Sequence, residues 1–223
     1  MEIAIRLEPL EARAFGVLIE KALTTPEQYP LTLNAVVLGA NQKVNRWPVL
    51  QLSEIEVSEA LDGLIEKELA RKVFPGNSRV DKYAHTGTSL LKIEVGQLAL
   101  LAELMMRGPQ TAAELRTRAG RMVPAESQEQ FEMWVHGLEA RGMVSRLPPS
   151  RGSRAERLAQ VLCPGLHLES AEQPPRTADA AQESTSPPRA ALHDRISALE
   201  VTVARLEAEL RALADKLGEP LDA

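Results

Sequence analysis

Residues that could carry out catalysis or bind a metal are few and widely separated in this chain. Four histidines and one cysteine occur among 223 residues, and they do not repeat at the spacing of a metal site. There is no phosphate-binding glycine loop, no dinucleotide fingerprint and no nucleophile elbow. Carboxylates are abundant, but no isolated pair stands in an apolar setting, as acid–base catalysis would need. We therefore predict a protein that is not an enzyme and has no cofactor or metal.

Basic side chains offer a different chemistry, because guanidinium and ammonium groups bind nucleic-acid phosphates. They concentrate near the ends of short predicted helices and in turn segments, such as the run Ser-Arg-Gly-Ser-Arg at 150–154. The candidate nucleic-acid-binding residues are Lys43, Arg46, Arg71, Lys72, Arg79, Lys82, Arg116, Arg118, Arg121, Arg146, Arg151, Arg154 and Arg157. Ordinary charged loops would give the same pattern, so both interpretations stay open.

A third set of candidate residues is acidic. A helix is predicted over residues 53–69, because Ser53 and Glu56 form a capping box and apolar residues follow at i, i+3 and i+4 spacing. The opposite face of this helix carries Glu59, Asp62 and Glu66. Near phosphates, each carboxylate would cost on the order of 1 kcal/mol even in water. We expect this face to remain solvated or to bind a partner protein.

The elements that position these side chains occur twice in the same order. The first set has helices near residues 9–23, 31–42 and 53–69, then two strand-like runs around a Pro-Gly-Asn turn. The second has helices near 94–107, 111–119 and 126–141, then strand-like runs at 143–147 and 157–162. A third helix leading into a β-hairpin wing is typical of winged helices, which usually lay that helix in the DNA major groove.

The predicted fold is α+β and mostly helical, with two tandem winged-helix domains and a C-terminal coiled-coil helix. The net charge of −5 belongs to the tail, because residues 1–92 carry −1, residues 93–165 carry +1 and residues 166–223 carry −5. The tail begins with a stretch rich in Pro, Ala, Ser and Glu, which predicts disorder. The predicted domains are 1–88 and 93–165 (winged helices), 166–191 (disordered linker) and 192–218 (coiled-coil helix).

The last segment repeats apolar residues at alternating spacings of three and four, which is the pattern of a coiled coil. The residues of this seam are Ile196, Leu199, Val203, Leu206, Leu210, Leu213 and Leu217. A short helix exposing seven large apolar side chains would be marginal alone. We therefore expect a homodimer through this helix, with docking onto the chain's own winged-helix body as the alternative.

The single Cys163 excludes an internal disulfide and fits a reducing compartment. No secretory leader pattern begins the sequence, and no apolar run approaches 18 residues. These features predict a cytoplasmic protein that does not interact with a membrane.

Several runs resemble the YceH family of bacterial proteins. They include Thr-Thr-Pro-Glu-Gln-Tyr-Pro-Leu at 24–31, Asn-Gln-Lys-x-Asn-Arg-x-Pro-Val at 41–49 and Arg-Gly-x-Gln-Thr-x-x-Glu-Leu-Arg at 107–116. The resemblance covers nearly the whole chain and implies a tandem winged-helix fold. It brings no established activity, so it implies no catalytic residues.

Two functional hypotheses follow from these patterns. The first is a DNA-associated regulatory or architectural protein that contacts the DNA backbone through basic wings and second-helix ends. The alternative is a protein–protein adaptor that uses acidic third-helix faces and binds no nucleic acid.

Overall fold

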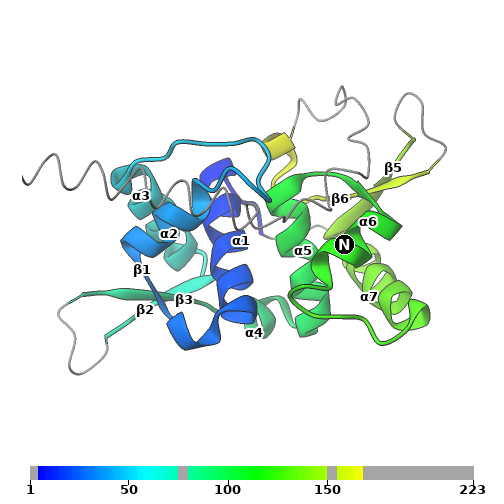
Figure 1. Ribbon diagram of the computed structural model, residues 1–223, viewed down its shortest axis with the longest axis horizontal. Helices are drawn as coiled ribbons and strands as arrows, with labels where there is room; N and C mark the ends of the chain where they lie inside the picture. Colours follow the sequence, from blue (N-terminus) through cyan, green and yellow to red (C-terminus); the bar gives the residue numbers. More distant parts are fainter. Residues whose placement is uncertain (1–4, 75–79, 150–154, 168–223) are drawn as a thin grey trace, which may run out of the picture. The chain divides into compact units, whose positions relative to one another are not determined.

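The computed structural model describes residues 5–74, 80–149 and 155–167 (Figure 1), all within one compact unit, Met1–Pro175. Arg79, Arg151, Arg154, the coiled-coil seam and residues 168–191 of the predicted linker lie outside the described residues. The first two residues of that linker are described, and Leu166 is buried while His167 contacts the Met105 carbonyl, so the packed structure extends past the predicted boundary at 165. Within the described residues the chain forms seven α-helices and two three-stranded antiparallel sheets. This part of the chain is therefore mixed α/β and mostly helical, as predicted.

The first half of the unit combines helices with one sheet. Its elements are α1 (Pro9–Thr24), a 3-10 turn (Pro26–Gln28), β1 (Leu31–Thr32), α2 (Leu33–Ala40), α3 (Glu54–Glu66), β2 (Ala70–Val73) and β3 (Lys82–His85). The strand order is β1-β3-β2. Ser53 and Glu56 form the predicted capping box at the start of α3, since each side chain accepts from the other residue's backbone N–H.

The second half repeats this order after a short connecting helix, α4 (Gly87–Leu91). Its elements are α5 (Val95–Arg107), β4 (Gln110–Thr111), α6 (Ala112–Ala119), α7 (Gln128–Ala140), β5 (Val144–Leu147) and β6 (Arg157–Gln160). The strand order, β4-β6-β5, matches that of the first sheet. The register matches too: Thr32 pairs with Lys82 in one sheet, and Thr111 pairs with Arg157 in the other.

The structure differs from the sequence prediction at both short strands. A helix was expected to begin at Leu31, but Leu31 and Thr32 pair with β3 before α2 begins. Thr32 ends this strand because it is also the N-cap of α2, where its hydroxyl accepts the Ala35 amide. Thr111 has the same two roles before α6.

The two halves share one hydrophobic core, in which α1 packs against α5. Residues 11–20 of α1 are all buried, and a helix buried on all sides lies at the centre of its domain. Phe15 and Leu18 from α1 and Leu101 and Met105 from α5 are fully enclosed. Gly16 permits close approach here, since a Cβ on it would lie 3.0 Å from Cγ of Met106.

Candidate functional site

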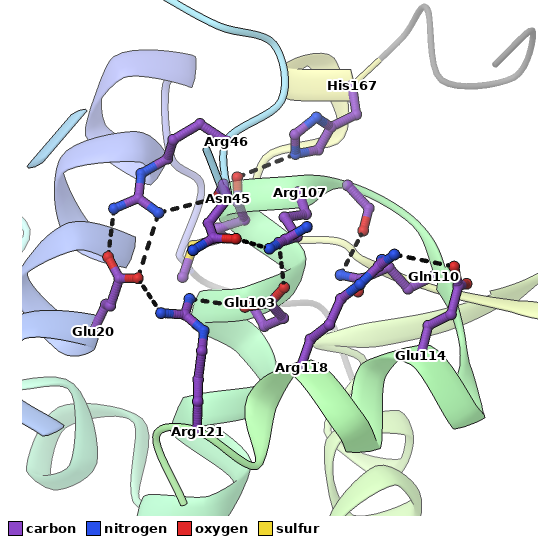
Figure 2. Close-up of polar contacts among 12 residues, drawn as sticks. Glu20, Asn45, Arg46, Glu103, Arg107, Gln110, Glu114, Arg118, Arg121 and His167 are labelled. Atoms are coloured by element: carbon purple, nitrogen blue, oxygen red, sulfur yellow. Dashed lines mark hydrogen bonds and ion pairs between the residues drawn. The ribbon is translucent and has the colours of Figure 1, made fainter. Parts of the chain in front are cut away.

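A group of polar and charged side chains, with Glu20, Arg46 and Glu103 buried at its centre, joins the two halves beside this core, and we call it the ionic cluster (Figure 2). Its members are Glu20, Asn45, Arg46, Glu103, Arg107 and Arg121. Three of them come from the first half and three from the second. Charges as buried as those of Glu20, Arg46 and Glu103 are rare unless they are paired.

Arg46 lies in the loop between α2 and α3 and is only 3% exposed. Its guanidinium binds both carboxylate oxygens of Glu20, which belongs to the last turns of α1. Arg46 Nε also donates to the Gly39 carbonyl at 3.0 Å, and Nη1 donates to the Asn45 carbonyl at 2.9 Å. Asn45 has φ of 65°, a left-handed conformation that Asn tolerates better than most residues. These bonds fix the loop onto α1.

The second half completes the cluster through Arg121, in the loop after α6. Its Nη1 donates to Glu20 Oε1 at 2.5 Å, and its Nη2 donates to Glu103 Oε2 at 3.2 Å. Glu103 is fully buried in α5 and also pairs with Arg107 Nε at 2.9 Å. Arg107 returns to the first half by donating to the Asn45 side-chain oxygen. The cluster thus forms a closed chain of charge-assisted hydrogen bonds and ion pairs between the halves.

Electrostatics keep the Glu20 carboxyl ionised despite its burial. Burial alone would raise its pKa, but the charges and hydrogen bonds of Arg46 and Arg121 outweigh that effect and hold the pKa below its usual value. The same carboxylates raise the pKa of Arg121 against the opposing effect of burial. Both carboxylates accept from arginines, so the cluster fastens structural elements together and presents no group suited to proton transfer.

Arg13 extends the positive charge of this region into the core. It is 0% exposed, and its guanidinium donates to the carbonyls of Pro48 at 2.8 Å and Ala40 at 3.4 Å. Burial and the nearby charge of Arg46 lower the pKa of Arg13 to about 10. Arg13 therefore holds the α2–α3 loop through backbone carbonyls, as Arg46 holds it through a carboxylate.

These contacts remove Arg46 from the predicted nucleic-acid interface and give several of its other cations partners within the protein. Arg46 cannot reach a phosphate, because it is buried and bound to Glu20. Arg121 is engaged by two carboxylates. Arg118 donates to Gln110 at 2.8 Å and pairs with Glu114 at 3.2 Å, and Arg116 donates to Gln128 at 2.9 Å. Of the cations predicted for α6 and the second-helix end, Arg46 is buried, Arg116 and Arg118 are half-buried, and Arg121 and Lys43 are exposed.

The hairpin cations lie nearer to solvent, but several have acidic neighbours. Lys72 Nζ lies 3.4 Å from Asp62 and 5.8 Å from the centre of the Tyr83 ring. Arg146 pairs with Glu139 at 2.7 Å and with Glu156 at 3.5 Å. Exposed pairs of this kind contribute about 0–1 kcal/mol and exchange partners readily. The remaining described hairpin cations are Arg71, which is exposed, and Lys82 and Arg157, which are half-buried.

The predicted acidic face of α3 is where the sequence placed it. Glu59, Asp62 and Glu66 are all exposed. Within the described residues only Asp62 of these three has an ion-pair partner, Lys72. This face was predictable because the apolar stripe of one helix determines which side is left to solvent.

The ionic cluster was not predicted, although the sequence contains a signal for it. Arg13 and Glu20 interrupt a helix whose other faces are apolar, and both are buried. Polar residues on a helix with apolar residues on every side indicate buried pairing. Among the described residues, no three His, Cys, Asp or Glu side chains gather as a group that could hold a metal ion. No helix in this part of the chain has the length and apolarity needed to cross a membrane.

Comparison with known proteins identifies the family. The family described as "Protein of unknown function, DUF480" matches residues 7–153, a range that contains every member of the ionic cluster. The chain belongs to the DUF480 family. The predicted resemblance to a bacterial family without an established activity is thereby confirmed.

DUF480 relatives match along almost the entire chain. A UPF0502 protein of Aeromonas hydrophila is 40% identical over 218 residues, which cover 96% of this chain and 97% of that protein. A UPF0502 protein of Geotalea uraniireducens is 43% identical over 217 residues, covering 95% and 96% respectively. One of Citrobacter koseri is 39% identical over 220 residues, covering 96% and 98%. These names describe no activity.

Proposed function

We propose that this DUF480 protein is a non-enzymatic adaptor whose two halves are winged-helix units and whose acidic third helices bind a basic surface of a partner protein. Each half supports the winged-helix interpretation by its element order: helix, short strand, helix, helix, hairpin. The equivalent strand orders and registers of the two sheets support a duplicated unit.

The observation that carries the proposal is the charge of the third helices. The exposed residues of α3 are Glu54, Ile55, Glu56, Glu59, Asp62 and Glu66. The exposed residues of α7, its counterpart, are Gln128, Glu129, Glu132, Met133, His136 and Ala140. Neither set includes a lysine or an arginine. A helix with this charge is repelled by phosphates, and it attracts a surface rich in lysine and arginine.

Each of these helix faces also exposes one large apolar side chain, which favours binding of a partner protein over a face that is only solvated. Ile55 of α3 is 71% exposed, and Met133 of α7 is 66% exposed. An apolar anchor bordered by charges is a common composition for protein-binding surfaces, whose affinity comes mainly from a few buried side chains. The carboxylates would then select the partner and its orientation.

DNA association is the second candidate, supported by the first hairpin. Arg71 and Lys72 are exposed on β2, Lys82 is half-buried on β3, and Lys43 is exposed after α2. Four such cations could contact phosphates without sequence readout. The carboxylates of α3 oppose this, since Asp62 already lies 3.4 Å from Lys72. This candidate predicts weak backbone binding that is strongly reduced by salt.

Affinity capture with quantitative mass spectrometry tests the adaptor. The full chain, a triple variant (Glu59→Gln, Asp62→Asn, Glu66→Gln) and a control (Glu27→Gln, Glu68→Gln, Asp81→Asn) would be compared in lysate of the native host. The control also removes three exposed acidic charges. The adaptor predicts a protein that the wild type and the control retain and the α3 variant loses. Identical protein profiles for all three would contradict it.

A further inference from the structure

A pocket with a volume of about 310 Å³ lies beside the second sheet, and the first half shows what fills the equivalent space there. The registers of the two sheets allow the halves to be compared residue by residue, because Thr32 corresponds to Thr111. Three residues earlier in each half, Tyr29 therefore corresponds to Gly108, and a proline follows both. Gly108 has φ of 82°, a conformation that favours glycine, so this position is suited to a residue without a side chain.

The Tyr29 side chain is enclosed by the first half. Its hydroxyl accepts the His85 backbone N–H at 2.5 Å, and its ring lies against the His85 ring, with ring centres 5.9 Å apart. Burial raises the pKa of Tyr29 to about 12, although the charge of Arg71 on β2 acts on the same hydroxyl in the opposite direction. Tyr29 is therefore packed between the end of α1 and the first hairpin.

The pocket in the second half is lined by the counterparts of these neighbours. The registers place Gln160 where the first sheet has His85, and Ser145 where it has Arg71. Both line the pocket, together with the glycine that stands at the position of Tyr29. The pocket therefore corresponds to the space that the tyrosine ring fills in the first half.

The second half also keeps the hydrogen-bond donor that the tyrosine uses. Val161 N–H donates to the Met143 carbonyl at 2.9 Å, on the β5 side of β6. Successive amides of a strand point to opposite sides, so the Gln160 N–H points away from β5, where β4 does not extend beyond Gln110. The His85 N–H points toward the tyrosine hydroxyl at the equivalent place.

The described lining favours an uncharged ligand. Leu104, Pro109 and Leu147 contribute apolar surface, and none of the described lining residues is acidic. Arg157 already interacts within the protein, and burial lowers the pKa of His167 to about 4, so its ring is neutral at pH 7. Small-molecule sites have this composition, with an apolar surface and a few polar groups that fix orientation, and their volumes begin near 300 Å³.

We propose that this pocket binds a small phenol. The ring of the ligand takes the place that the Tyr29 ring has in the first half, and its oxygen accepts the Gln160 N–H. The group that is missing from the second half thus defines the class of ligand. The proposal does not rest on the adaptor function, because the described lining of the pocket includes neither acidic helix face.

The test is a titration of the full chain with p-cresol, which is the tyrosine side chain as a free molecule, followed by nuclear magnetic resonance at backbone amides. We expect a saturable shift of the Gln160 amide. The His85 amide is the internal control and should not shift, because Tyr29 already occupies its site. Toluene, which lacks the hydroxyl, should bind about two- to tenfold more weakly, because one neutral hydrogen bond is lost.

A variant that fills the pocket gives a second test. Ala159 is half-buried in the pocket wall, so Ala159→Met should weaken p-cresol binding about tenfold or more through steric overlap. Ala113→Met is the matched control, since Ala113 is exposed on α6, and it should leave the affinity unchanged. Circular dichroism establishes that both variants are folded before they are titrated.

Any of four results would overturn the proposal: no saturable shift at Gln160, an equal shift at His85, toluene binding as tightly as p-cresol, or full affinity in the folded Ala159→Met variant. If Ala159→Met does not fold, the comparison of p-cresol with toluene in the wild type decides alone.

Discussion

Arg121, which follows α6, donates a 2.5 Å hydrogen bond to Oε1 of Glu20, 101 residues earlier in the chain. Glu20 is 2% exposed and also binds Arg46. One buried carboxylate is therefore the counter-ion of guanidiniums from both halves. The two halves are joined by this polar contact as well as by the packing of α1 on α5, which accounts for a single compact unit rather than two separate domains.

Replacing Glu20 by Gln should strongly destabilise the protein. The substitution leaves Arg46 and Arg121 beside each other without a shared negative charge, and removing one partner of a buried pair costs about 3–5 kcal/mol. Urea denaturation measures this free energy of unfolding. Glu59→Gln, on the exposed face of α3, should change it by less than about 0.5 kcal/mol. If the Glu20 variant and the wild type have equal free energies of unfolding, the ionic cluster does not stabilise the fold.

The partly buried imidazole of His167 should make stability depend on pH. Its pKa falls from 6.5 to about 4 because burial disfavours the charged ring. Protonation then favours the unfolded chain, so the stabilising contribution is complete above pH 6.5 and is lost as the pH falls toward 4. We expect this to remove about 3 kcal/mol at most across that range.

His167→Gln should flatten the pH dependence of the free energy of unfolding between pH 6.5 and 4. His136→Gln is the control, because His136 is exposed on α7 and should leave the slope as in the wild type. Urea denaturation at several pH values gives the comparison. If the slope of His167→Gln equals that of the wild type, the ring does not titrate as the structure implies.

Close packing between α5 and α7 should make Gly96 intolerant of a side chain. A Cβ at Gly96 would lie 2.2 Å from Cζ2 of Trp134, whose indole N–H is held by Glu94 at 2.9 Å. Gly96→Ala should therefore cost about 1–3 kcal/mol through overpacking. Gly165→Ala, where no atom lies within 4 Å of the new Cβ, should cost much less. Thermal unfolding, monitored by circular dichroism, compares the melting temperatures of the Gly96→Ala and Gly165→Ala variants.

The heptad seam of the tail gives a prediction that rests on sequence alone. β-Branched Ile196 and Val203 at a positions, with leucines at d, favour a parallel two-stranded coiled coil. We expect the full chain to sediment as a dimer and a chain ending at Ser170 to sediment as a monomer. If both chains sediment as monomers, the seam does not dimerise. A dimer that survives truncation would place the interface elsewhere.

Local signals predicted most of the elements correctly. Ser53 with Glu56 and Thr111 with Glu114 are capping boxes in the structure, because the bonds involve residues only three apart. The helix-to-hairpin junctions were predictable for the same reason. In contrast, β1 and β4 have two residues each and exist only through pairing with strands far along the chain. Nothing in two residues can specify such a partner.

The candidate site was predicted less well than the fold, and Arg46 shows why. A basic residue in a polar loop is usually exposed, so it was assigned to a nucleic-acid surface. Its burial is accompanied by an ion pair with Glu20, which precedes it by 26 residues, and Arg121 of the other half binds the same carboxylate. The face of α3 was predictable because exposure there follows from the helix's own apolar stripe, whereas burial of a loop residue follows from tertiary contacts.

Binding of a random-sequence DNA duplex at low salt, followed by fluorescence anisotropy as salt is raised, shows whether the α3 face excludes DNA. We expect little binding by the wild type and a shallow salt dependence, because the carboxylates of α3 oppose the hairpin cations. The triple variant Glu59→Gln, Asp62→Asn, Glu66→Gln should bind more tightly. The opposite result would be a steep dependence of the wild-type binding constant on salt. In that case the slope of log K against log salt concentration would fall by about 0.9 for each of Arg71→Ala, Lys72→Ala and Lys82→Ala, and the hairpin would be a DNA-binding surface.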